Sequence, residues 1–281
     1  MILGNQTGVV PQYPKNFIKY TELFPDSEEF KYMATAVNGG NAQGKTPGND
    51  IKVFGDAGYY VMRNGWEPSS TVMIFSNNKS NDISTDLERW SHNQPDNGTF
   101  ELYINKRNFF PDSGVYSYEY NTNTDSGKAR LWFRNSENHN TLTTRKMLRR
   151  RKQICLGFQI RSRQTLKADA DVLVFENQGY DNLKHRRTVF YVDKSYFVLV
   201  DEGIGEATGD LHLNFNLCEN KDNVVLDVEQ KGAHTSFADN NNIVIRTFAE
   251  DNNSITCQEK RDVFHSQVLQ MMVIKNALLT L

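Results

Sequence analysis

The sequence predicts an all-β protein, a large antiparallel β-sandwich, and two observations support this fold class. Short runs of aromatic and β-branched residues recur along most of the 281 residues, separated by turns rich in Asn, Asp and Gly. From about residue 51 these runs follow one another at short spacing with no helices between them, so successive strands are expected to pair antiparallel. The 17 Phe and 12 Tyr can fill the core, although only 38% of the residues are hydrophobic.

The expected strands can be placed in order along the chain. The first two, at 58–63 and 71–75, turn around Asn64-Gly65-Trp66, and the strand at 99–104 enters a hairpin through Asn105-Lys106-Arg107-Asn108. Later strands are expected at 171–175, 187–192, 196–200, 211–217 and 242–246, with a tight turn at 193–195. Residues 211–217 alternate strictly, which predicts apolar side chains inside and polar ones outside.

Residues 1–50 differ from the rest of the chain and are expected to form a separate part. They are polar and rich in Gly, Asn and Pro, and after Pro25 they predict one short helix, with Asp26 or Ser27 as its N-cap. We interpret residues 1–50 as the end of a larger unit and its linker, and residues 51–281 as the sandwich. The first residues lack a basic stretch followed by an apolar run, so no signal peptide is expected in this chain.

Two segments of the sandwich are atypical. Residues 144–152 contain six basic residues in nine positions, and the segment that follows, up to residue 167, is expected not to form a strand. The basic run suggests binding of heparin or nucleic acid, but without interleaved aromatic residues we interpret it as a solvated loop. Residues 270–279, within the atypical end at 265–281, predict a helix. Both segments resemble divergent or frame-shifted sequence.

Composition argues against several classes of function. The net charge of −2 provides no global field for nucleic acid or anionic membranes, and neither is expected as a partner. No stretch approaches the roughly 20 apolar residues of a membrane span. Cys155, Cys218 and Cys257 match no metal-ligand spacing, and their odd number argues against a disulfide framework, with a single bridge left open.

Three polar clusters lie at the ends of successive expected strands and predict a site. The first is His92-Asn93-Gln94-Pro95-Asp96-Asn97-Gly98, the second Phe110-Pro111-Asp112-Ser113-Gly114, and the third Arg134 with His139-Asn140-Thr141. Such residues are poorly suited to a core and well suited to a cleft.

These clusters resemble the heparinase II/III-like polysaccharide lyases. Two further segments share the resemblance, Phe54-Gly55-Asp56-Ala57-Gly58-Tyr59-Tyr60 and Glu176-Asn177-Gln178-Gly179-Tyr180. The resemblance covers about residues 1–143 and 168–255. It implies an N-terminal α/α toroid followed by an antiparallel sandwich, of which this chain would hold the end of the toroid and most of the sandwich. It also implies an acidic polysaccharide of the heparan sulfate or heparin type as substrate, and a periplasmic or secreted enzyme.

In this family uronate-containing chains are cleaved by β-elimination, and the toroid supplies a catalytic Asn and Tyr that have no counterpart in this chain. We therefore expect the chain to be inactive without a toroid. His92 matches the sandwich histidine that contacts the uronate or assists proton transfer; the alternative is a surface histidine bonded locally. A second hypothesis for the whole chain is a non-catalytic sandwich that binds acidic polysaccharide.

The resemblance also assigns residues around His92. Gln94, Asp112 and His139 match positions that often hold a structural divalent metal, calcium or zinc, with a metal-free hydrogen-bonded cluster as the alternative. From their own chemistry, Arg134 and Asn138 beside this cluster are expected to bind sulfate or carboxylate groups, with a surface salt bridge of Arg134 as the alternative.

Other residues near these clusters are expected to be structural. Tyr116 and Tyr118 alternate with Val115 and Ser117, which suggests one buried face; both tyrosines are expected to pack in the core, with a cleft-lining face as the alternative. Asp96 and Asn97 are expected to shape their loop. The sequence assigns no role to the histidines at 185, 212 and 234.

Overall fold

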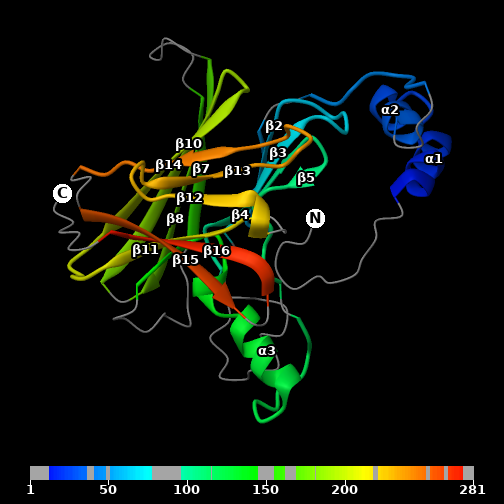
Figure 1. Ribbon diagram of the computed structural model, residues 1–281. Coiled ribbons are helices and arrows are strands. Elements are labelled where there is room, and N and C mark those ends of the chain that lie inside the picture. Colours follow the sequence, from blue (N-terminus) through cyan, green and yellow to red (C-terminus); the bar gives the residue numbers. More distant parts are fainter. Residues whose placement is uncertain are drawn as a thin grey trace.

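The computed structural model (Figure 1) describes residues 13–36, 41–48, 51–77, 96–114, 116–144, 155–161, 169–180, 182–217, 221–250, 254–262 and 265–274. Most of these residues lie in strands, and every strand pair is antiparallel, which confirms the all-β prediction. Within these ranges the helices are all too short or too polar to cross a bilayer.

Two sheets enclose the main core. The first has the strand order β1 (Lys52–Phe54), β2 (Tyr59–Arg63), β3 (Thr71–Ser76), β4 (Thr99–Ile104) and β5 (Arg107–Asn108). The second has the order β10 (Tyr196–Ile204), β9 (Leu183–Val192), β8 (Ala170–Tyr180) and β7 (Cys155–Arg161). Their inward side chains interlock, and Phe175 of β8 stacks on Tyr60 of β2 at 5.9 Å between ring centroids. Each aromatic ring buried there contributes about 1.5–3 kcal/mol.

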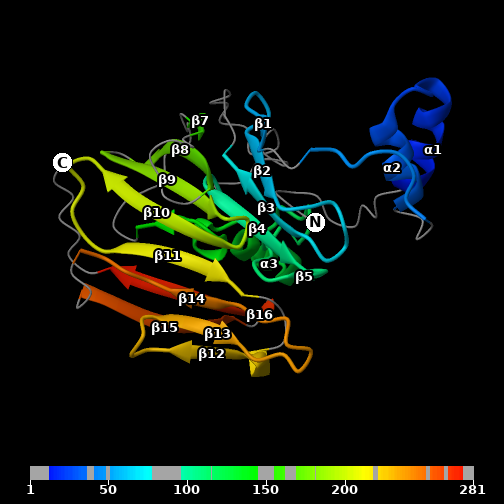
Figure 2. The same cartoon turned by 90° about the horizontal axis from the view of Figure 1, so that it is seen from above.

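Two further sheets complete the described part of the molecule (Figure 2). One has the order β15 (Ile255–Asp262), β16 (His265–Ile274), β11 (Leu211–Asn216) and β6 (Leu142–Thr143). The other has the order β12 (Val224–Asp227), β13 (Gly232–Thr235) and β14 (Val244–Arg246). A smaller apolar cluster joins Leu142 and Leu213 to Leu183 and Tyr180, so β6 and β11 pack against the ends of β8 and β9.

Helices α1 (Tyr13–Leu23) and α2 (Glu28–Ala36) lie to one side of the sheets (Figures 1 and 2). The predicted N-cap is confirmed, because Ser27 Oγ accepts a hydrogen bond from the backbone N–H of Phe30 at 3.3 Å. Helix α1 was not expected. Tyr32 of α2 donates a hydrogen bond to the Glu67 carboxylate, which raises the pKa of Tyr32 to about 12.

The strand predictions at 71–75 and 99–104 are confirmed by β3 and β4. The tight turn between β9 and β10 is also present. Its central residues, Asp193 and Lys194, have positive φ angles of 48° and 52°, as a two-residue hairpin turn requires.

Three segments differ from the sequence-based expectation. Helix α3 (Asp125–Phe133) interrupts the strands, and Thr124 caps it by accepting from the N–H of Gly127. Strand β7 lies in the stretch expected to be incompatible with a strand and pairs with β8. Strand β16 replaces the first half of the helix expected at 270–279, because β15 and β11 pair with it on both sides and override local propensity. The basic run at 145–152 lies outside the described residues.

Candidate functional site

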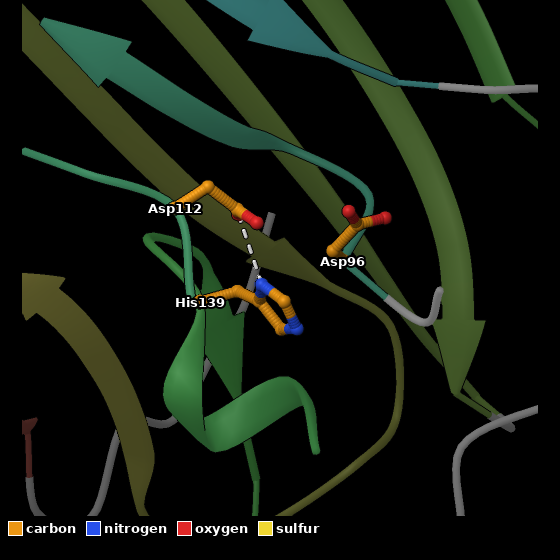
Figure 3. Close-up of side chains that lie close together, drawn as sticks. All are labelled: Asp96, Asp112 and His139. Atoms are coloured by element: carbon orange, nitrogen blue, oxygen red, sulfur yellow. Dashed lines mark hydrogen bonds and ion pairs between the residues drawn. The ribbon is translucent and has the colours of Figure 1, made fainter. Parts of the chain in front are cut away.

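Asp96, Asp112 and His139 come from three separate loops and meet at one place (Figure 3). Asp96 lies just before β4, Asp112 follows β5, and His139 follows a short 3-10 helix, η1 (Ser136–Asn138). One potential ligand atom from each residue lies within 4.8 Å of the others. The residues are 1%, 9% and 0% exposed, so the cluster is buried. The predicted meeting of the three polar clusters is confirmed.

Asp112 and His139 form the centre of this cluster. Asp112 Oδ2 lies 2.9 Å from His139 Nδ1. Asp112 Oδ1 accepts from the N–H of Gly114 at 2.9 Å, an Asx turn that fixes the carboxylate. Ser113 Oγ lies 3.2 Å from the same His139 nitrogen and donates to the carbonyl of Phe133. The loop after β5 is therefore tied to the end of α3.

The donor set fits a divalent cation. Two carboxylates and one imidazole supply oxygen and nitrogen ligand atoms within 4.8 Å of one another in a buried cluster. Two aspartates and a histidine are also a known type of zinc ligand set.

The structure tests the predicted metal ligands only in part. Asp112 and His139 are brought together as expected, whereas Gln94 and the catalytic candidate His92 lie outside the described residues. Asp96, which was expected only to shape its loop, is the third member of the cluster. Its backbone carbonyl does accept from the N–H of Thr99, so it also shapes the turn. The sequence signal that could have identified Asp96 as a member of the cluster was an acidic residue at the same strand end as two suspected ligands.

Arg134 and Asn138 occupy different environments. Arg134 is half-buried at the end of α3, and burial together with the charge of Arg130 lowers its pKa below the usual value. Asn138 is only 1% exposed, and its Nδ2 donates to the carbonyl of Trp132 at 2.6 Å. The amide of Asn138 thus braces the turn that carries His139, and its contact with a ligand stays a prediction.

The expectation that Tyr116 and Tyr118 pack in the core is wrong. Their exposed fractions are 57% and 48%. The alternation that suggested one buried face belongs to an irregular segment, and Tyr116 has a positive φ of 65°.

A buried charged cluster that the sequence analysis missed supports two of the three loops. Arg187 of β9 is fully buried and forms a bidentate pair with Asp201 of β10, with Nε–Oδ1 at 2.6 Å and Nη2–Oδ2 at 3.1 Å. Its Nη1 donates to the carbonyls of Gly98 at 2.7 Å and Asn140 at 3.0 Å. These residues lie two positions after Asp96 and one after His139. One guanidinium therefore fixes the backbone beside two members of the candidate site.

His185 completes the charged cluster. Its Nε2 lies 2.6 Å from Asp201 Oδ1, and Gly98 packs against its ring. Gly98 has a φ of 85°, and a Cβ there would lie 3.2 Å from the imidazole, so both conformation and space favour glycine. Burial alone would raise the pKa of Asp201, but the charge of Arg187 and the bond to His185 outweigh burial and hold it well below the usual value.

Asparagines of β11 fasten the His139 loop from the other side. Asn216 donates from its N–H to Asn140 Oδ1 and from its Nδ2 to the carbonyl of Asn138, at 2.5 and 2.7 Å. Asn214 Nδ2 donates to the carbonyl of Thr141 at 3.1 Å. Both β11 asparagines are buried, at 0% and 1% exposed, so the predicted polar-outward face of this strand is wrong. The Nδ2 groups of both asparagines donate to loop carbonyls in place of solvent.

Comparison with known proteins identifies the family of this chain. Residues 46–271 match the family model described as Heparinase II/III-like, C-terminal. The chain belongs to this family. The heparinase II/III-like resemblance of the sequence is thereby confirmed, and the match spans all four sheets.

Two similar relatives are both named heparin-sulfate lyase. A heparin-sulfate lyase of Bacteroides thetaiotaomicron is 58% identical over 243 residues, which are 86% of this chain and 33% of the relative. A heparin-sulfate lyase of Pedobacter heparinus is 35% identical over 243 residues, 86% of this chain and 34% of the relative. A crystal structure of heparinase III superposes with a TM-score of 0.78 at 52% identity, covering 94% of this chain and 40% of that one. The chain thus spans about a third of the length of the two lyases.

Proposed function

We propose that this chain works as the C-terminal sandwich of a lyase that cleaves heparan sulfate or heparin by β-elimination. The observation that carries the proposal is the 58% identity to a heparin-sulfate lyase across 86% of the chain. The proposed enzyme also needs an N-terminal α/α toroid, which supplies the remaining catalytic groups. A periplasmic or secreted location is part of the proposal, because the substrate is an extracellular polysaccharide.

In this reaction a base removes the proton at C5 of the uronate, the bond from C4 to the leaving oxygen breaks, and a C4–C5 double bond forms. An acid protonates the leaving oxygen. The C5 proton is acidic only when the neighbouring carboxylate is neutralised. We assign His92 to contact with the uronate or to proton transfer, and Arg134 to binding of carboxylate or sulfate by its planar guanidinium.

We further propose that Asp96, Asp112 and His139 hold a divalent cation with a structural role. The imidazole ligand favours zinc, because calcium prefers six to eight oxygen ligands.

Zinc is expected to raise the melting temperature of the metal-free chain. At a free concentration about a hundred times its dissociation constant, a ligand adds about 2.7 kcal/mol to the stability. Asp112→Asn should remove most of this gain, whereas Asp239→Asn, an exposed aspartate paired with Arg107, should keep it. Thermal unfolding with zinc, calcium or chelator measures the effect. Equal zinc responses in the two variants, or no response to either cation, would contradict the metal site.

The proposed activity is tested by supplying the toroid. The chain is mixed with, or fused to, the N-terminal part of the Bacteroides thetaiotaomicron relative and incubated with heparan sulfate. We expect ultraviolet absorbance from unsaturated uronate with the combined protein and none with either part alone. Saturable heparan sulfate binding without product, in a correctly folded fusion, would favour the non-catalytic binding module instead.

A further inference from the structure

Three tyrosines form an exposed aromatic strip immediately after the candidate site. Tyr116, Tyr118 and Tyr120 are 57%, 48% and 44% exposed, and the first of them lies only four residues after Asp112. We call these three residues the tyrosine strip. Isolated exposed aromatics are ordinary, but three at alternate positions beside a buried polar cluster are typical of a binding surface.

Residues of α3 contact the rings of the strip. Tyr116 stacks on Phe133 of α3, with ring centroids 5.2 Å apart and planes 20° apart. The guanidinium carbon of Arg130, also on α3, lies 4.6 Å from the ring centroid of Tyr120 and 5.7 Å from that of Tyr118. Arg130 is only 4% exposed. Each tyrosine thus has one face in contact with the protein and part of its surface open to solvent.

The backbone of the strip is also fixed. Arg130 Nη1 donates a hydrogen bond to the carbonyl of Ser117, between the first two tyrosines. Tyr116 occupies the left-handed region, with a φ of 65°, which is strained for a bulky residue and persists only where the surroundings impose it. A rigid aromatic side chain loses little conformational entropy when it binds a ligand.

Two arginines, Arg130 of α3 and Arg134 at its C-cap, lie close to the strip, and Glu119 stands between Tyr118 and Tyr120 in the sequence. Arg130 has no carboxylate partner in the part of the chain that the structure describes. Arg134, one helical turn further on, is close enough for charge interactions with Arg130, Tyr120 and Asp96. Two guanidinium groups this close repel each other, and an anion between or beside them relieves the repulsion.

We propose that the tyrosine strip is a glycan-binding subsite, in which the tyrosines stack on the pyranose rings of an acidic polysaccharide and Arg134 binds its carboxylate or sulfate groups. The chemical class of the ligand rests on the proposed function. The negative face of an aromatic ring suits the C–H groups on the face of a sugar.

The test measures binding of a heparan sulfate oligosaccharide to the chain by titration calorimetry at low salt. Tyr118→Ala and Tyr120→Ala should each weaken binding about five- to tenfold, as expected for loss of one stacked ring. The corresponding Phe variants keep the ring and should bind within about twofold of the wild type. Tyr196→Ala removes a tyrosine of similar exposure, 55%, on β10 and serves as the matched control. Unchanged melting temperatures verify that the variants fold.

A second probe separates ring stacking from charge. Polyvinyl sulfonate, a polyanion without sugar rings, should bind the alanine variants as well as it binds the wild type. Equal heparan sulfate affinity for wild type and alanine variants would overturn the subsite, as would failure of the wild-type chain to bind heparan sulfate.

Loss of association with the added toroid, without loss of glycan affinity, would show that the strip is a domain interface. Lyase activity of the combined protein is scored separately, so a failed subsite leaves the proposed function standing. A failed elimination assay in turn leaves the binding result interpretable.

Discussion

Arg187→Met is expected to lower the free energy of unfolding by about 3–5 kcal/mol, because breaking a buried ion pair leaves the remaining charge uncompensated. Arg187 is 0% exposed, and its loss would leave Asp201 with His185 as its remaining charged partner and remove the donor of the Gly98 and Asn140 carbonyls. Urea denaturation of the wild type and the variant at pH 7 measures the loss.

Arg186→Met provides the control on the same strand. Arg186 points to the opposite face of β9, its side chain is 33% exposed, and it pairs with Glu176. A partly exposed pair of this kind contributes about 1 kcal/mol or less. Equal losses for the two arginine variants would contradict the role given to Arg187.

The pH dependence gives a second readout for the same variant. The folded pKa of Asp201 lies below its unfolded value, so its stabilising contribution is present above the ordinary aspartate pKa of about 3.9 and is lost as the pH falls through the folded pKa. Without Arg187 the buried carboxyl favours the protonated form, and its pKa rises. The deficit of Arg187→Met relative to wild type should therefore narrow between pH 7 and pH 4. A constant deficit would mean that lost packing, and not charge, causes it.

His92→Ala is expected to reduce the rate of elimination by the toroid-complemented enzyme by about 10²–10⁴-fold, the usual contribution of a positioned acid or base. The initial rate of ultraviolet absorbance measures it. A role confined to proton transfer would lower kcat with little change in KM, whereas contact with the uronate carboxylate in the ground state would also raise KM.

His234→Ala is the control for this prediction. His234 lies on β13, paired with Asp227 in the three-stranded sheet, and its replacement should change the rate less than twofold. A rate for His92→Ala within a few-fold of wild type would remove His92 from the catalytic groups while leaving the fold assignment intact.

The fold was predictable wherever local pattern and tertiary pairing agree. Residues 99–104 are rich in aromatic and β-branched residues, and they form β4 as expected. Strand β16 was not predictable in this way, because its ten residues are held by β15 and β11, which lie elsewhere in the sequence. Helix α3 was missed since its buried positions include Gly127 and Arg130, which do not form an apolar stripe.

The candidate site was predictable in its local parts only. Asp112 and His139 were found because each stands in a short polar motif that resembles a family pattern, and the structure brings them within hydrogen-bonding distance. Arg187, in contrast, does not stand in a recognisable short polar motif. It sits at a buried position of β9, in line with His185 and Val189, and a charge at such a position was the signal that could have identified it.

The two carbonyls bound by Arg187 have a consequence for the order in which the molecule folds. Gly98 and Asn140 are separated from Arg187 by 89 and 47 residues, so neither contact can form until the β9–β10 hairpin has docked. Closing such long loops costs conformational entropy, which other contacts must first offset. The polar cluster is therefore among the last parts to assemble, and a nascent chain would acquire its sheets before Asp96 and His139 are fixed beside each other.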